Sequence, residues 1–336
     1  MIRRMFAILF IILSVFLLFS CENGATVTPR SRVFYDYFDT VGTFYDYSGL
    51  SEEKFNDIAN RVELSLSDYH KLFDIYNEYD GIVNLATINR TAGGGAQKVD
   101  KKIVDLLLYC KEMYNLTGGE VNVAMGAVLE IWHEYRTAGT EIPPMSVLSD
   151  AKNHTDISAI VIDEENLTVE LLDPDMSIDV GAVAKGYAVE MTAQMLEDAG
   201  YAGCVLDVGG NLRAIGAKPD GSGWMAGIRN PLSPYSQTYI YKIEIKDSSL
   251  VTSGVYERYY TVGGVRYHHI IDGESLMPEN RYLSVSVKAD SSAMSDALST
   301  AIFNMTPDEA REFVESQRGI FVVLVMPNGK TVTLGE

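Results

Sequence analysis

Residues 179–208 read DVGAVAKGYAVEMTAQMLEDAGYAGCVLDV, a stretch that joins a helix to a strand. The helix is predicted from about Gly181 to Gly200, and an apolar strand follows from Cys204 to Val208. Beyond it, strands follow one another without helices between them, at residues 224–228, 239–246, 256–261, 265–271 and 282–289. Runs of strands set apart from runs of helices favour an α+β fold over a doubly wound sheet.

The remaining segments favour the same class. An alternating, aromatic-rich strand is predicted from Phe34 to Tyr47, with a break near Gly42. The other predicted elements are helices from Ser51 and from Asp100 to Thr117, a loop at 139–149, a strand pair at 159–162 and 168–172, a helix at about 293–303, a helix opened by the capping box Thr306-Pro307-Asp308-Glu309, and a hairpin turned on Asn328-Gly329.

The N-terminus has the pattern of an export signal. Arg3 and Arg4 precede an apolar run that ends in Ser20-Cys21 and is short for a transmembrane helix. A cysteine after a small residue resembles a bacterial lipobox, so we expect lipidation of Cys21; an uncleaved signal anchor is the alternative. Either one places the domain outside the cytoplasm. We predict a signal peptide at residues 1–20, a tether at 21–32 and a single domain at 33–336.

The charge of the chain limits its partners. The formal net charge is -19 at pH 7. Because nucleic-acid binding needs clustered basic side chains, no nucleic-acid partner is expected. An acidic surface is repelled by anionic lipid, so attachment to a membrane needs an anchor. Cys110 and Cys204 lie in apolar segments, which favours buried thiols; a disulfide is the alternative in an exported protein.

Two glycine-containing segments are candidates for binding an anionic ligand. Asp179 precedes a helix start whose free N–H groups attract phosphate, and Lys185 can reach back to an anion. In Leu206-Asp207-Val208-Gly209-Gly210-Asn211-Leu212, the paired glycines let the backbone approach a ligand closely. The alternatives are a capped helix with a solvated Lys185 and an ordinary Gly-Gly turn.

Two further segments carry groups suited to catalysis and metal binding. Tyr267-His268-His269-Ile270-Ile271-Asp272 places two histidines beside a carboxylate, which could orient one of them as a general base. In Ser295-Asp296-Ala297-Leu298-Ser299-Thr300, Asp296 and Thr300 share one helix face, and their oxygens suit Mg²⁺. A hydrogen-bonded strand-end histidine and an exposed helix face are the alternatives.

The order of these segments resembles the ApbE family. Gly118-Gly119-Glu120-Val121-Asn122 and Thr252-Ser253-Gly254 also match, and the resemblance runs from about Val33 to Val332. It implies a T-fold-like α+β architecture of antiparallel sheets with packed helices, with two lobes around an FAD cleft. It also implies transfer of FMN from FAD to a Thr or Ser of exported redox-complex subunits, with release of AMP. The implied location is the periplasmic side of the inner membrane, through a lipid anchor.

The resemblance also assigns roles to single residues. Mg²⁺ is expected at the Ala182 backbone carbonyl, the Asp296 carboxylate and the Thr300 hydroxyl. Lys185 is expected near the FAD phosphates, and His269 is expected to take the proton from the acceptor hydroxyl. The other implied FAD contacts are Val41, Tyr76, Glu120, Val121, Asn122, Asp179, His269 and Ile270.

Two departures from the family pattern keep other functions open. Gly119-Glu120-Val121-Asn122 stands where the family usually has Gly-x-Phe-Asp, and residues 273–278 replace the usual Pro-x-Thr-Gly after the histidine motif. The main alternative is a Mg²⁺-dependent FAD pyrophosphatase that releases FMN to water. The other is a periplasmic lipoprotein that only binds FAD, although simple binding would not require Asp296 and Thr300 beside a metal.

Overall fold

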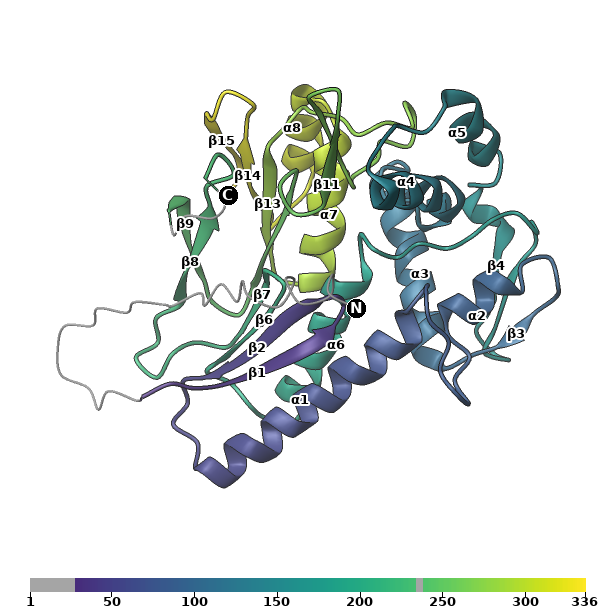
Figure 1. The fold of residues 1–336 in the computed structure, drawn as a ribbon. Coiled ribbons are helices and arrows are strands. Elements are labelled where there is room, and N and C mark those ends of the chain that lie inside the picture. Colours follow the sequence, from purple (N-terminus) through teal and green to yellow (C-terminus); the bar gives the residue numbers. More distant parts are fainter. Residues whose placement is uncertain (1–27, 234–237) are drawn as a thin grey trace, which may run out of the picture.

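An eight-stranded antiparallel sheet is the largest element of the structure, a computed structural model that describes residues 28–233 and 238–336 (Figure 1). The strand order is β1-β2-β6-β7-β10-β13-β14-β15. The strands are β1 (Arg30–Tyr37), β2 (Thr40–Asp46), β6 (Cys204–Val208), β7 (Asn211–Ile215), β10 (Ser249–Gly254), β13 (Ser284–Ala289), β14 (Phe321–Val325) and β15 (Thr331–Gly335). The predicted antiparallel α+β class is therefore confirmed.

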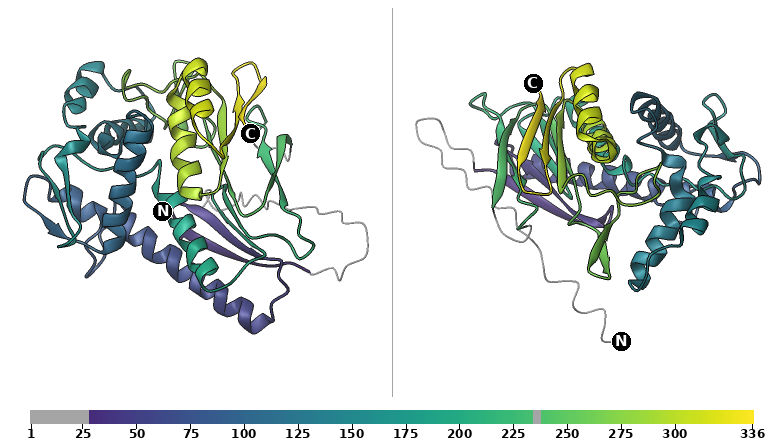
Figure 2. Two further views of the ribbon diagram at one scale, coloured as in Figure 1. Left: turned by 180° about the vertical axis from the view of Figure 1, so that it is seen from behind. Right: turned by 90° about the horizontal axis from the view of Figure 1, so that it is seen from above.

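Helices cover one face of this sheet, and a hairpin covers the other. Figure 2 shows α6 and α7 side by side against the strands, with α1 crossing beneath α6 and α8 beside β15. Successive residues of β6 alternate between the two layers: Leu206 packs under the helices, whereas Val205 packs with Trp224 of the hairpin. The bounds are α1 (Glu52–Phe73), α6 (Ala184–Asp198), α7 (Ser292–Asn304), α8 (Pro307–Ser316), β8 (Trp224–Arg229) and β9 (Tyr239–Ile245).

A second group of elements lies on the side of α6 and α7 away from the β8–β9 hairpin. It contains a three-stranded sheet of order β3-β5-β4 (Figure 1). It also contains, later in the chain, the β11–β12 hairpin, which packs against α4. The bounds are α2 (Leu85–Arg90), β3 (Gln97–Lys98), α3 (Lys101–Leu116), η1 (Val123–Met125), α4 (Gly126–Ala138), α5 (Met145–Lys152), η2 (Ile157–Ala159), β4 (Ile160–Asp163), β5 (Thr168–Leu171), β11 (Tyr259–Val262) and β12 (Val265–His268).

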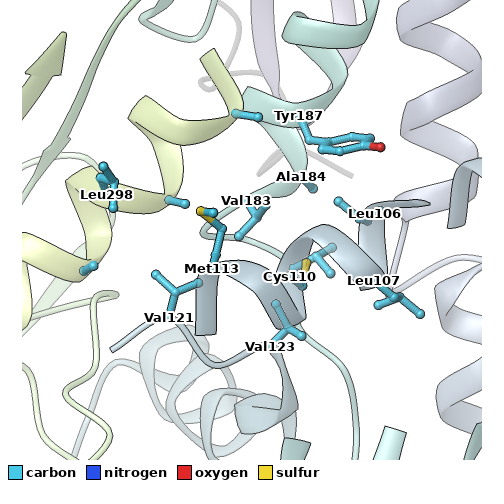
Figure 3. Packing of buried hydrophobic residues seen from close by; sticks show 14 of the residues in the cluster. Leu106, Leu107, Cys110, Met113, Val121, Val123, Val183, Ala184, Tyr187 and Leu298 are labelled. Atoms are coloured by element: carbon cyan, nitrogen blue, oxygen red, sulfur yellow. The ribbon is translucent and has the colours of Figure 1, made fainter. Parts of the chain in front are cut away.

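One hydrophobic cluster joins this group to the helices on the large sheet. Figure 3 shows Met113 of α3 and Val121 packed beside Val183, Tyr187 of α6 and Leu298 of α7. The side chains that carry the predicted chemistry therefore stand on elements that share a core. The division into two lobes around an FAD cleft stays a prediction.

Several boundaries differ from those predicted. The break in the first strand falls at Phe38 and Asp39, where φ is 54° and 52°, and Gly42 remains within β2, opposite Val208. Helix α6 begins at Ala184, three residues later than predicted, because residues 181–183 form a turn. The sheet begins at Arg30, within the predicted tether.

Other elements were missed altogether. Helix α5 occupies part of the predicted loop at 139–149; only Leu148 of its side chains is fully buried, so its apolar periodicity is weak. Helices α2 and α4 and strands β7 and β10 were not predicted either. Strands β7 and β10 contain Asn, Arg, Ser and Thr, which hid their alternation.

Cys110 and Cys204 are buried and free, as favoured from the sequence. Cys110 belongs to the cluster around α3, and Cys204 belongs to a separate cluster under α1. Within residues 28–233 and 238–336, no helix is both long and apolar enough to cross a membrane. The predicted signal peptide and Cys21 lie outside the described residues.

Candidate active site

The first candidate region is the α6–α7 junction, by which we mean Ala182, Lys185, Gly186, Asp296 and Thr300. The Gly186 N–H donates to Asp296 Oδ2 over 2.7 Å. A Cβ at Gly186 would overlap the Asp296 side chain and stand 2.5 Å from the Ser292 carbonyl oxygen. Glycine is therefore required here, because only a residue without a side chain lets the two helices approach this closely.

This contact leaves the Ala182 carbonyl free. In a helix extended by one turn, the Gly186 N–H would bond to the carbonyl four residues back, which belongs to Ala182. It bonds to Asp296 instead, and no other residue in the described part of the chain donates a hydrogen bond to Ala182. A free carbonyl, a buried carboxylate and the Thr300 hydroxyl one turn along α7 are the hard oxygen donors that Mg²⁺ prefers. The residues present thus fit the metal that the sequence implied.

Lys185 connects the junction to the paired-glycine segment. Its Nζ lies 3.5 Å from Asp296 Oδ1 and donates to Asn211 Oδ1. Asn211 is 1% exposed, and within residues 28–233 and 238–336 its Nδ2 has no hydrogen-bond partner. Asp207 accepts a hydrogen bond from the Gly210 N–H. Burial raises the pKa of its carboxyl, and the positive charge of Lys185 opposes that shift. Two segments that the sequence marked separately therefore converge on one lysine.

The second candidate region is the arginine cluster: Tyr76, His133, Arg136, Asp179, Arg258 and His269. Arg136 and His133 of α4 share a hydrogen bond of 2.9 Å, and the His133 ring lies 5.4 Å from that of Tyr76. Asp179 accepts from the Gly181 N–H over 2.7 Å, and burial raises the pKa of its carboxyl against the opposing charges of the cluster. The cluster therefore gathers positive charge around a partly exposed aromatic ring.

His269 is oriented by backbone and not by a carboxylate. Its Nδ1 lies 3.2 Å from the Arg258 carbonyl oxygen, which can only accept, so Nδ1 carries the proton and Nε2 keeps its lone pair. Burial first, and Arg258 second, lower the pKa of His269 to about 3. Asp272, which the sequence suggested as the orienting acid, instead accepts from the Glu274 and Ser275 N–H groups and pairs with Arg281. That suggestion was wrong, because the chain turns away after Ile271.

The remaining implied FAD contacts differ in what they offer. Val41 and Tyr76 are 40% and 61% exposed, so their side chains are accessible. Val121 and Ile270 are buried and can present only backbone. Asn122 caps η1 through the Ala124 N–H and donates to the Thr155 carbonyl. Burial, followed by Asp272, raises the pKa of Glu120. Their roles stay predictions.

Sequence reasoning missed several residues of these regions. Arg136 and Arg258 lie in no motif, and only the fold brings α4 and the loop before β11 to the same place. Asn211 stood within the paired-glycine segment without a role. Its position directly after Gly209-Gly210 was the one signal that could have marked it.

The sequence model of the ApbE family matches residues 41–324. The chain belongs to the ApbE family. A curated relative from Treponema pallidum, named FAD:protein FMN transferase, is 30% identical over 258 residues, which are 73% of this chain and 71% of the relative. Among solved structures, the ApbE protein of Thermotoga maritima has a TM-score of 0.81 at 26% identity and covers 91% of this chain and 97% of its own.

The flavin transferase ApbE from Vibrio cholerae has a TM-score of 0.75 at 22% identity, covering 91% of this chain and 98% of that protein. At this identity the likeness concerns the fold alone. The predicted ApbE membership and the predicted α+β fold of antiparallel sheets with packed helices are thus confirmed.

Proposed function

We propose that this ApbE protein is a Mg²⁺-dependent FAD:protein FMN transferase that moves FMN from FAD to a Thr or Ser hydroxyl of an exported redox protein and releases AMP. The transferase activity agrees with the names of its curated relatives. The observation that carries the proposal is the α6–α7 junction, where the Asp296 carboxylate lies between the Gly186 N–H and Lys185, with the Thr300 hydroxyl one turn along α7 and the Ala182 carbonyl without a donor among the described residues.

The junction suits a pyrophosphate. Mg²⁺ held by Ala182, Asp296 and Thr300 would offset phosphate charge and make phosphorus a better electrophile. Lys185 and Asn211 Nδ2, which has no hydrogen-bond partner among the described residues, add donors next to the same place. Phosphoryl transfer depends mainly on positioning and electrostatics, and these residues supply both.

His269 supplies the site for the proton. The acceptor hydroxyl oxygen forms a bond to the phosphorus of the FMN moiety, the bond from that phosphorus to the AMP oxygen breaks, and the hydroxyl proton passes to Nε2. The lowered pKa keeps Nε2 unprotonated at neutral pH. A base with so low a pKa binds a proton weakly, and bound anionic phosphate near Arg258 would raise its proton affinity.

The arginine cluster suits the flavin part of the substrate. The Tyr76 ring offers an exposed aromatic surface, and Arg136 and Arg258 offer positive charge to an anionic ligand. We assign the implied contacts of Val41, Glu120, Val121, Asn122 and Ile270 to the same substrate.

The deciding experiment uses the full-length protein in mild detergent, with FAD and Mg²⁺, with and without an exported flavin-acceptor domain. AMP, FMN and the mass of the acceptor are followed. An acceptor heavier by one FMN, absent in EDTA and with Asp296→Ala, supports the proposal. Full activity in EDTA contradicts the metal dependence, and no AMP at all leaves a protein that only binds FAD.

FAD hydrolysis is the second candidate, and one feature of the structure favours keeping it. Asn122, which replaces the usual acid, is occupied by hydrogen bonds to the chain and so offers less to the substrate. AMP and free FMN with an unmodified acceptor, tested against several acceptor domains, would identify the pyrophosphatase.

We also propose that the protein is exported and acylated at Cys21, which anchors it to the periplasmic side of the inner membrane. The sequence pattern around Ser20-Cys21 supports this. Mass spectrometry of the mature N-terminus is expected to show a lipid-modified Cys21. An intact Met1 in the membrane fraction would instead identify an uncleaved signal anchor.

A further inference from the structure

Helices α6 and α7 are connected at two points, one turn apart. The Gly186 N–H of α6 donates to Asp296 of α7, and the Ser292 N–H of α7 donates to Glu190 Oε2 of α6 over 2.6 Å. Each helix therefore provides a carboxylate to a backbone N–H of the other. A step of four residues forward on α6 corresponds to four residues backward on α7, so the helices run antiparallel in a fixed register.

The same register leads to the proposed metal site. Four residues before Gly186 is Ala182, and four residues after Asp296 is Thr300. Ala182 lies in the turn directly before α6, and Thr300 lies one turn farther along α7, so both follow the two carboxylate contacts at the same end of the helix pair. Four residues of a helix advance by about 6 Å along its axis. A slide of α7 along α6 would therefore move Asp296 and Thr300 relative to the Ala182 carbonyl, and the three proposed metal ligands would no longer match one ion.

We propose that Glu190 is a positioning residue for the metal site, which it serves by fixing the register of α7 along α6. The inference rests on the proposed metal dependence. Glu190 lies at the opposite end of the contact from Thr300, and among the described residues its carboxylate bonds to Arg213, Ser292 and Gln194, none of which is a proposed metal ligand or FAD contact. It acts through Ser292, the first residue of α7, whose N–H has no acceptor within its own helix.

The surroundings of Glu190 hold its carboxylate in one place. Arg213 of β7 donates to both oxygens, from Nε over 3.1 Å and from Nη2 over 3.4 Å. Both side chains are almost fully buried, at 4% and 5% exposure. A buried ion pair of this kind contributes little net stability compared with apolar side chains of the same volume, because of the cost of removing the charges from water. The clearest effect of the ion pair is on orientation, because Arg213 holds Glu190 so that its Oε2 faces the Ser292 N–H at the start of α7.

Other contacts hold α7 against the sheet, whereas Glu190, together with the Asp296 contacts to Gly186 and Lys185, sets its position relative to α6. The hydroxyls of Ser295 and Ser249 are 2.6 Å apart, and those of Ser299 and Ser253 are 2.8 Å apart, which ties α7 to β10. Apolar packing between the helices is non-directional, so by itself it does not align a carboxylate with a backbone N–H. The carboxylate contacts at Gly186 and Ser292 are the direct hydrogen bonds found between α6 and α7 in the described residues.

Glu197 provides a matched control for Glu190. It also projects from α6 and accepts from Arg213, over 2.8 Å, but within the described residues no hydrogen bond or ion pair joins it to α7. Glu197→Gln therefore weakens the same ionic network without touching the helix register. Any effect found with Glu190 variants and absent in Glu197→Gln belongs to the α7 contact.

The test measures Mn²⁺ binding by the full-length protein, from the electron paramagnetic resonance signal of free Mn²⁺, alongside the metal dependence of AMP release. We expect Glu190→Ala to bind Mn²⁺ about tenfold more weakly, as is common when groups that orient metal ligands are removed. Its kcat at saturating metal should stay close to the wild-type value. Glu190→Gln, whose amide oxygen can still accept the Ser292 N–H, should fall in between, and Glu197→Gln should bind as the wild type does.

A second variant covers the case in which Glu190→Ala fails to fold. Ser292→Pro removes the N–H and, with it, the buried Ser292 hydroxyl, which has no hydrogen-bond partner among the described residues. Proline is tolerated at the first helical position, and Ser291 already has the extended backbone that precedes proline. It should weaken Mn²⁺ binding while melting cooperatively without metal. Wild-type affinity in folded Glu190→Ala or Ser292→Pro overturns the inference. Wild-type protein that binds no Mn²⁺ and works in EDTA overturns the proposed metal dependence itself.

Discussion

The α6–α7 junction and the arginine cluster differ in how firmly their side chains are held. Asp296 is 5% exposed and is fixed by the Gly186 N–H and Lys185. Tyr76 is 61% exposed in the loop after α1, and its one ring neighbour among the described residues, His133, lies on α4. One region is therefore built before any ligand arrives, whereas the other leaves its largest side chain free to adjust.

The difference matches the ligands proposed for each region. Mg²⁺ demands near-ideal geometry from its oxygen ligands, so a site for it has to be preorganised. A flavin is large and flat, and an exposed aromatic ring can adapt to it at low cost. The comparison predicts that changes in the junction affect metal, stability and rate together, whereas changes in the arginine cluster affect substrate use and leave stability at neutral pH unchanged.

The largest effect is expected for Asp296→Ala. It removes a proposed metal ligand and also the acceptor of the Gly186 N–H, and the loss of several kcal/mol of transition-state stabilisation corresponds to about 10³-fold or more in AMP release. Thr300→Ser, which keeps the hydroxyl, is the control and should retain most activity. Metal-dependent AMP release that survives in Asp296→Ala would show that the junction is not the metal site.

His269→Gln tests the residue of the arginine cluster that is proposed to accept the proton. Losing a general base typically costs about 10²- to 10⁴-fold, so FMN transfer should fall by that factor while the KM for FAD changes little. His268→Gln is the matched control: His268 is buried and bonded to the Glu279 carbonyl and the Ile270 N–H, so its loss should lower stability more than rate. Equal loss of activity in both variants would argue against a specific role for His269.

Gly186→Ala tests the close approach within the junction. The added methyl would overlap Asp296 and the Ser292 carbonyl, and overpacking of this kind costs about 1–3 kcal/mol of unfolding free energy. Gly42→Ala is the control, because its Cβ would meet its nearest neighbours at 3.6 Å, an ordinary contact. Both are measured by denaturant unfolding. If the two variants lose the same stability, the helix approach at Gly186 is not tight.

The sequence predicted the junction better than the arginine cluster, for a physical reason. Gly186 and Asp296 each lie in a segment whose composition is unusual for a helix, and such local departures are visible in a single chain. Arg136 and Arg258 are ordinary surface-type residues, and only the tertiary fold places them beside Asp179. The orienting acid proposed for His269 failed similarly, because adjacency in sequence did not become contact in space.

The same limit applies to the elements. Helices α1 and α3 were predicted because their apolar residues repeat regularly and Ser51 and Asp100 cap them. Strand β7 was missed because Arg213 interrupts its pattern, and the ion pair with Glu190 that allows its burial lies on another element. A buried charge cannot be recognised from sequence without its partner.

A smaller effect is expected in the pH dependence of stability. The folded-state pKa of His269, about 3, lies below its usual value of 6.5, so the unfolded chain binds the proton more readily. The resulting stability is present above pH 6.5 and is lost as pH falls toward 3. Urea unfolding at pH 7.5 and 4.5 should therefore show a larger loss of stability in the wild type than in His269→Gln. Parallel losses would mean that the His269 ring titrates normally.

The smallest effect, and the sharpest test of the comparison, is expected for Tyr76→Ala. An aromatic contact is typically worth about 0.5–1.5 kcal/mol, which corresponds to a KM for FAD raised by roughly two- to tenfold. Because Tyr76 is 61% exposed, the free energy of unfolding should not change. Tyr35→Ala, at a tyrosine that is 53% exposed on β1 and outside the cluster, should alter neither quantity. Lower stability with an unchanged KM would make Tyr76 a structural residue. The α6–α7 junction and the arginine cluster would then differ in exposure but not in the kind of ligand that they bind.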